Sequence, residues 1–272
     1  MPDNGEADAR AEARRMLEEC DVKRPDDIDL DAMAAKLHAE IVYDDLDGAT
    51  ASVMRIGWNA RIRISNRIHD IGWQRFTIAH EFGHLRLGHE IPTGTAKEVI
   101  ERFCKPLEKN RKPPERTASV FASELVMPES LVKPYCGAPH ITLAPAREIA
   151  DAFFTSVLAS AMRITEITAK RCAVAYTVLG RVCWLKRSAT FPNWIPHGRR
   201  VDPRSAVFEY NERGKLDGAA QLLTADVWLP RDRIDGANIH LVEQSSVIPE
   251  LGAVFTMLWI PDHEVSHLDL AA

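Results

Sequence analysis

Apolar residues recur at helical spacing in several separate stretches of the chain. In the first of these, residues 6–20, one helix face carries small or apolar side chains and the remainder is charged; the face consists of Ala9, Ala13, Met16, Leu17 and Cys20. This pattern predicts an amphipathic helix that docks on the rest of the protein. The same spacing predicts further helices at 32–40, 73–88 and 115–127, and two or three short helices within 141–171.

Residues that favour helix ends set the limits of these stretches. Asp31 can cap the helix at 32–40, because its carboxylate can accept the first free backbone N–H groups. Gly88 suits the left-handed conformation that often ends a helix, and Pro128 cannot continue the helix that precedes it.

Strand patterns occur in two parts of the chain. Residues 52–56 and 61–65 alternate apolar and polar side chains on either side of a turn-rich break at 57–60, which predicts a hairpin. From residue 173 onward the chain turns to strand-like runs, with a turn at Gly180. The mixture predicts an α+β fold whose parts divide near residues 140 and 172.

Composition and charge exclude several classes of protein. The 34 Lys and Arg residues are outnumbered by 39 Asp and Glu, and the net charge of -5 argues against a protein that coats phosphate backbones. Five widely spaced cysteines form neither a disulfide framework nor a CxxC metal site. The sequence contains no long apolar run, and its opening residues include acids instead of an apolar signal core, so we expect a cytoplasmic protein without a membrane span.

The strongest chemical signal is the run His80-Glu81-Phe82-Gly83-His84 within the helix predicted at 73–88. Two histidines four residues apart leave the same face of a helix, so both imidazoles can bind one cation. Glu81 lies on the adjoining flank, where its carboxylate can reach a water held by that cation. This is the arrangement that a metallohydrolase needs.

A catalytic zinc ion takes three protein ligands, so a third ligand must come from elsewhere in the chain. The downstream candidates are His89, Glu90, Glu101, Glu108, Glu115 and Glu124. His89 points away from the pair if the helix persists that far, which favours a capping or structural role. Glu115 is the preferred ligand, because the small side chains Ala118, Ser119 and Ala122 would let its helix approach closely, whereas Glu124 projects from the opposite side.

Two motifs in this order resemble the ImmA/IrrE family of metallopeptidases. The helix TIAHEFGHLRLGH is followed about thirty residues later by the pattern ExxAxxFAxELxMP, which here comprises Glu115, Ala118, Phe121, Ala122, Glu124, Leu125, Met127 and Pro128. The resemblance implies that His80, His84 and Glu115 bind zinc in a gluzincin-like site and that Glu81 is the catalytic carboxylate. Ser119 stands where the family commonly has Asn.

The resemblance also implies an arrangement of domains. Residues 1–140 correspond to a zincin-like metallopeptidase domain and 141–172 to a short region of helix-turn-helix appearance. Residues 173–272 match only loosely, as the α+β, GAF-like sensor domain that some members carry.

As a member of that family, the protein is expected to be a zinc-dependent, site-specific endopeptidase. Its expected substrate is a helix-turn-helix transcriptional repressor, whose cleavage releases genes of stress response or mobile elements. Zn²⁺ is the expected metal, with another divalent metal such as Mn²⁺ as the alternative. Direct nucleic-acid binding is not expected, because the basic and acidic residues of 141–171 offset one another. The alternative function is a zinc-stapled binding module that sequesters a repressor or toxin without turnover.

Several assignments stay open at this level. An oxyanion donor could be Tyr135, His89, His140 or an arginine. The strand at 61–65 could lie at the edge of the cleft and pair with an extended substrate, or it could be an ordinary sheet strand. The pair His263 and His267 could hold a second metal, although a polar tail explains it better, and the basic run 105–112 is typical of a solvated loop.

Overall fold

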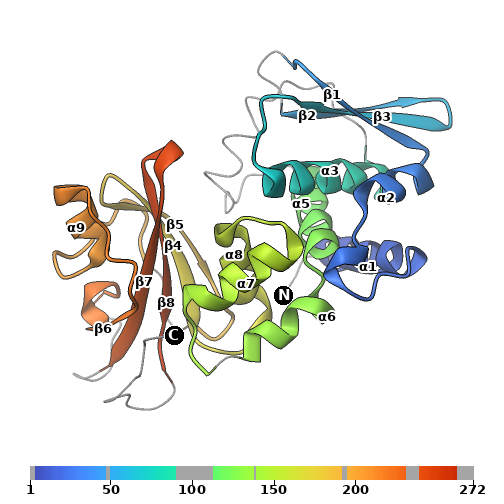
Figure 1. The fold of residues 1–272 in the computed structure, drawn as a ribbon. Helices are drawn as coiled ribbons and strands as arrows, with labels where there is room; N and C mark the ends of the chain where they lie inside the picture. The colour runs from blue at the N-terminus through green and yellow to red at the C-terminus, as the bar shows by residue number, and fades with distance from the viewer. Residues whose placement is uncertain are drawn as a thin grey trace. The chain divides into compact units, whose positions relative to one another are not determined.

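The computed structural model describes residues 4–46, 50–89, 113–137, 139–191, 195–230 and 239–261. The chain forms two compact units (Figure 1). The first comprises Met1–Val132 with Ile149–Ser156, and the second comprises Lys133–Glu148 with Val157–Ala272. Each contains helices and one sheet, in agreement with the mixed α and β content expected from sequence. The finer division at residues 140 and 172 stays a prediction.

The first unit combines a small sheet with several helices. Its elements in chain order are α1 (Asn4–Glu19), η1 (Pro25–Asp27), α2 (Leu30–Lys36), β1 (Ala39–Asp44), β2 (Ala51–Ile56), β3 (Asn59–Ser65), α3 (Ile71–Arg86), α5 (Pro113–Val126) and α6 (Glu129–Val132). In Figure 1 the sheet lies on one side of α3, while α5 and α1 lie on the other. Helix α3 is therefore enclosed from both sides, and every residue from Thr77 to Leu85 is buried.

The predicted hairpin is confirmed as β2 and β3, which pair antiparallel. Of the two alternatives that the sequence left open for residues 61–65, the structure shows an ordinary sheet strand and not an edge strand free to pair with a substrate. The strand order is β1-β3-β2, with β1 parallel to β3, so both sides of β3 are already hydrogen-bonded. Strand β3 alternates buried and exposed residues along most of its length and supplies Ile62 and Ile64 to the core.

The ends of the helices follow local capping. Asp70 begins α3 by accepting a 2.6 Å hydrogen bond from the Trp73 N–H. Gly88 adopts a left-handed φ of 64° beyond its other end, as the sequence predicted. Helix α2 differs from expectation: its cap is Asp29, not Asp31, and Asp29 accepts the N–H groups of both Asp31 and Ala32.

Helix α1 docks as its amphipathic pattern predicts. Ala9, Ala13 and Met16 are at most 1% exposed. Its charged side forms ion pairs with the neighbouring helices; these join Arg14 to Glu124 and Glu129, Glu12 and Glu19 to Arg86, and Glu6 to Arg116. Several of these pairs are partly exposed, so the buried apolar face contributes more to docking.

The second unit is built on an antiparallel sheet with the strand order β5-β4-β8-β7-β6. The strands are β4 (Cys172–Val178), β5 (Arg181–Arg187), β6 (Gln221–Thr224), β7 (His240–Ile248) and β8 (Ala253–Trp259). Its short elements include η2 (Lys133–Gly137), η3 (Ala225–Val227), η5 (Pro249–Leu251) and the helix α9 (Ala206–Arg213). An apolar core that includes Trp228, Phe191 and Leu258 fills this unit.

The stretch 141–171 forms two helices, α7 (Leu143–Phe153) and α8 (Val157–Ile167). Their number agrees with the pattern of apolar residues, and the helix-turn-helix interpretation stays a prediction. None of the helices in the described part of the chain has the length and apolarity to cross a membrane.

Candidate metal centre

Three side chains that the sequence singled out converge between α3 and α5. His80 and His84 project from α3, and Glu115 projects from the first turn of α5. The two Nε2 atoms lie 3.1 Å apart. His80 Nε2 is 3.3 Å from Glu115 Oε2, and His84 Nε2 is 3.5 Å from Glu115 Oε1. Both imidazoles are buried, and the glutamate side chain is 14% exposed.

The donor set and these spacings fit a divalent metal ion. Imidazole nitrogens and a carboxylate oxygen are common zinc ligands, at about 2.0–2.2 Å from the ion. A tetrahedron of that size has edges of about 3.3–3.6 Å, close to the three distances observed. The residues present could therefore hold such an ion without rearrangement.

Close helix packing brings the carboxylate within reach of the histidines. Gly83, on the turn between the two histidines, lies directly against the backbone of Ala118 on α5. Ala118 and Ala122 are completely buried, as expected for the small side chains of a close helix contact. Glu115 lies one turn before Ala118, and so it faces the histidine pair.

Ser119 sets the tautomer of His80. Its hydroxyl donates to the Glu115 carbonyl oxygen at 2.9 Å and also lies 3.3 Å from His80 Nδ1. Because a hydroxyl has one proton and this one is used on the carbonyl, His80 Nδ1–H donates to the serine oxygen. The lone pair of His80 Nε2 then faces His84 and Glu115, which is the state that a metal ligand requires.

His89 has the corresponding role for His84, which sequence reasoning missed. The expectation that His89 points away assumed a continuing helix, but α3 ends at Arg86 and Gly88 reverses the chain. The His89 N–H donates to the His84 carbonyl oxygen at 3.1 Å, so the capping role is confirmed. Its ring also returns to the site, with Nδ1 at 3.1 Å from His84 Nδ1.

Thr117 determines the direction of this second contact. Its hydroxyl donates to the carbonyl oxygens of Pro113 and Pro114 and lies 3.2 Å from His89 Nε2. His89 Nε2–H therefore donates to Thr117, and His89 Nδ1 accepts the Nδ1–H of His84. Burial lowers the pKa of His89, and the charge of Glu115 opposes this effect. The lowered pKa favours the neutral ring, which this series of hydrogen bonds needs. His84 Nε2 is left with its lone pair toward His80.

The other residues that the sequence suggested as metal ligands or catalytic groups lie in different parts of the protein. Glu81 is buried, at 8% exposed, beside the two histidines in α3. Glu124 faces α1, where its Oε1 accepts a 2.9 Å hydrogen bond from Arg14 Nε. Glu90, Glu101 and Glu108 lie outside the described residues, as do the basic run 105–112 and the pair His263 and His267. Tyr135 and His140 belong to the second unit.

The fold and the site together define a class: a mixed α/β protein with a buried His-His-Glu centre of metal-binding geometry on two packed helices. Residues 31–165 match the family model Peptidase_M78, described as the IrrE N-terminal-like domain. Through this segment the chain belongs to the ImmA/IrrE family, a family of metallopeptidases.

A solved structure titled "Mycobacterium tuberculosis transcriptional regulator" has a similar fold. The similarity covers 93% of this chain and 88% of that one, with a TM-score of 0.57 and 14% sequence identity. At this identity the likeness establishes the fold alone. No curated protein matches the chain.

Proposed function

We propose that the protein is a zinc-dependent, site-specific endopeptidase that cleaves a helix-turn-helix transcriptional repressor in the cytoplasm. The observation that carries the catalytic part is the triangle formed by His80, His84 and Glu115. Two imidazole lone pairs and a carboxylate directed at one point repel each other unless a cation lies between them.

In this proposal His80, His84 and Glu115 hold the ion, in a zincin-like arrangement with a gluzincin-like third ligand. Zn²⁺ fits the donor set best, and another divalent metal such as Mn²⁺ is the alternative. When bound, the metal supplies an acidified water and polarisation of the substrate carbonyl. Ser119 and His89 keep the two imidazoles in the tautomer that can bind it.

Glu81 is the general base. It adjoins His80 on α3 without belonging to the metal-binding triangle, as expected of a carboxylate that acts on a water and not on the ion. Its carboxylate takes a proton from the attacking water and returns it to the leaving amine. A buried site favours this transfer, because neighbouring charges interact more strongly away from bulk water.

The regulatory part of the proposal rests on family membership. An unrestricted protease would damage its host, so selectivity must come from docking surfaces outside the metal centre. The helices α7 and α8 are the proposed docking region for the repressor. Release of stress-response or mobile-element genes would follow cleavage. The fold likeness to a protein titled a transcriptional regulator is consistent with this role.

The test compares cells that produce the wild-type protein, Glu81→Gln or Glu18→Gln. Glu18 is an exposed residue of α1, so its variant controls for loss of one negative charge. Proteins with new N-termini are identified by chemical labelling. The proposal predicts a new N-terminus in a helix-turn-helix repressor with the wild type and Glu18→Gln, and none with Glu81→Gln.

Two results would contradict the proposal. If no new N-terminus depends on Glu81, the protein is not a protease of this type. If Glu81→Gln abolishes cleavage but leaves the expression of the repressed genes raised, the biological role is sequestration, as in the alternative of a binding module.

A further inference from the structure

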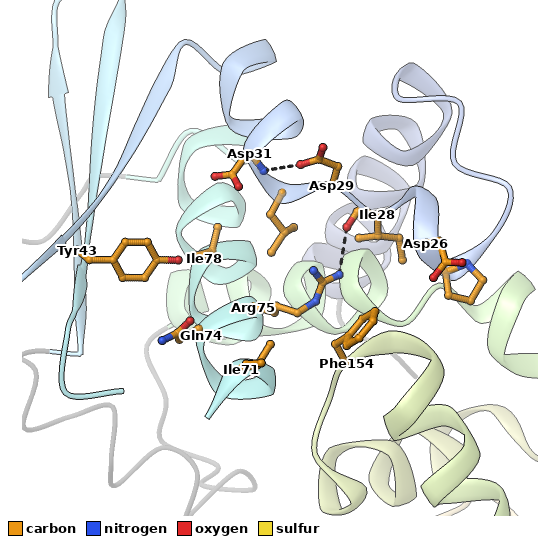
Figure 2. Close-up of a pocket in the computed structure, with 12 residues that line it drawn as sticks. Asp26, Ile28, Asp29, Asp31, Tyr43, Ile71, Gln74, Arg75, Ile78 and Phe154 are labelled. Atoms are coloured by element: carbon orange, nitrogen blue, oxygen red, sulfur yellow. Dashed lines mark hydrogen bonds between the residues drawn. The ribbon is translucent and has the colours of Figure 1, made fainter. Parts of the chain in front are cut away.

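A cavity lies on the face of α3 opposite the candidate metal centre. Its volume is about 500 Å³, within the usual range for small-molecule sites. At about 100° per residue, Arg75 and Ile78 project roughly 140° and 160° away from His80, so the two sites do not overlap. Residues of η1, α2, β1 and α3 line the cavity together with Phe154, and Figure 2 shows their arrangement.

Arg75 is the distinctive group of this cavity. Its Nη2 donates to the Ile28 carbonyl oxygen at 3.2 Å. Its Nε is buried without a hydrogen-bond partner, and within the described residues its guanidinium forms no ion pair. Burial lowers the pKa of Arg75, and the charge of Asp29 opposes this effect. A partly buried guanidinium with unused donors is a receptor for a carboxylate.

In the part of the chain that the structure describes, the nearest acidic side chains do not form an ion pair with Arg75. Asp29 Oδ1 accepts the N–H groups of Asp31 and Ala32, both at 3.0 Å, and so this oxygen caps α2. Asp26 and Asp31 are exposed and also line the cavity. The lining therefore contains a guanidinium that can bind an anion and, beside it, carboxylates that can bind a cation.

Apolar side chains line the same cavity while remaining largely open to solvent. Tyr43, Ile71 and Phe154 are 54%, 61% and 52% exposed. Phe154 also has a left-handed φ of 53°, which is strained for a bulky residue, and its ring centroid lies 5.8 Å from the Arg75 guanidinium carbon. Exposed apolar groups and backbone strain gathered in one place are typical of a binding site.

The wall that carries Phe154 is held firmly. A Cβ added at Gly72 would lie 2.9 Å from backbone atoms of Thr155 and Ser156, so the first turn of α3 packs directly on this segment. The aromatic ring and the guanidinium are therefore positioned by packed backbone and not only by side-chain contacts.

We propose that this cavity binds a free α-amino acid with an apolar side chain. The ligand carboxylate pairs with Arg75, its ammonium group faces the aspartates, and its side chain packs on Phe154 and Ile71. An anion alone would be repelled by three aspartates, and a cation alone would leave the Arg75 donors unused. A zwitterion satisfies both. This inference does not depend on the proposed protease activity.

The test measures binding by titration calorimetry to the full chain, with L-leucine, leucinol and 4-methylpentanoate as probes. Leucinol lacks the carboxylate, and 4-methylpentanoate lacks the ammonium group. A ligand of about ten heavy atoms is expected to bind in roughly the millimolar range. We expect L-leucine to saturate the site and each analogue to bind about tenfold or more weakly.

Two variants test the assignment of residues. Arg75→Gln should weaken L-leucine binding about tenfold or more, whereas Arg15→Gln, at an exposed position of α1, should leave it unchanged. No saturable binding of L-leucine by the wild type up to about 10 mM would overturn the proposal. Equal binding of L-leucine and either analogue would also overturn it, and this comparison remains decisive if Arg75→Gln fails to fold.

Discussion

Gly83 and Ala118 bring their helices together at the level of the candidate metal centre. A Cβ at position 83 would lie 3.0 Å from the Ala118 Cα and 3.1 Å from the Ala118 carbonyl oxygen. Both of these atoms are backbone, so a side chain at position 83 cannot be accommodated by a rotamer change. The distance from Glu115 to the histidines depends on this contact.

We expect Gly83→Ala to weaken metal binding by pushing α5 away from α3. The added methyl group raises helix propensity by about 1 kcal/mol, but overpacking costs about 1–3 kcal/mol, so the net loss of stability is small. Zinc affinity, measured by competition with a chromophoric chelator, should fall much further than stability. Gly57→Ala is the control, because Gly57 has open space around it and a φ of 63°. That variant should lose stability and keep its zinc affinity; equal zinc affinity in both variants would contradict the role of the close approach.

The hydrogen-bond chain from Thr117 through His89 to His84 predicts a second effect on metal affinity. Loss of an outer partner of a metal-binding histidine typically costs 10–100-fold. We expect His89→Phe to lose about this much and Thr117→Val to lose less, while Thr117→Ser retains the hydroxyl and the wild-type affinity.

Nitrogen-15 NMR reports the tautomers of the histidines in this series of hydrogen bonds. A substitution that only changes the stability of the fold would leave these tautomers unchanged. In the wild type, His84 should carry its proton on Nδ1, and in Thr117→Val the two tautomers should mix. If His84 is protonated on Nε2 in the metal-free wild type, the direction assigned to these hydrogen bonds is wrong.

Glu166 predicts a difference in acid stability that is independent of the metal centre. Partial desolvation raises the pKa of this carboxyl, but ion pairs with Lys186 and Arg163, both at 2.8 Å, outweigh it and lower the pKa from 4.5 to about 2. The stabilisation is present above pH 4.5 and is lost as the pH falls toward about 2.

We expect Glu166→Gln to lower the free energy of unfolding by about 1 kcal/mol near pH 7, because solvent screens ion pairs of partly exposed side chains. The difference from the wild type should shrink steadily below pH 4.5, as followed by urea unfolding in the presence of a chelator. A constant difference down to about pH 3 would show that the charge of Glu166 is not what stabilises the second unit.

The sequence was most informative where one helix carries the chemistry. The spacing of His80 and His84 determines their common face, and the small residues of α5 indicated which side of that helix approaches. The choice of Glu115 over Glu124 followed from position around the helix, and of these two residues the structure places Glu115 beside the histidines. These are local properties that helical periodicity conveys directly.

The errors arose where the path of the chain in space decides the outcome. Strand order is not encoded in hairpin periodicity, and so the central position of β3 between β1 and β2 was not predictable from residues 51–65. The contact of the His89 ring with His84 was missed because helical angles were extended past the end of α3. Gly88 was already recognised as a stop, and a left-handed stop reverses the chain, so that signal could have indicated the return of His89. The Arg75 cavity joins segments far apart in sequence and left no local pattern.

The most direct test of the central claim is the metal content of protein purified without chelators, measured by elemental analysis together with that of Glu115→Gln and Glu124→Gln. We expect about one zinc or other divalent metal ion per chain in the wild type and in Glu124→Gln, and substantially less in Glu115→Gln. A wild-type protein that contains no such metal and does not bind added Zn²⁺ would contradict the assignment of His80, His84 and Glu115 as a metal centre.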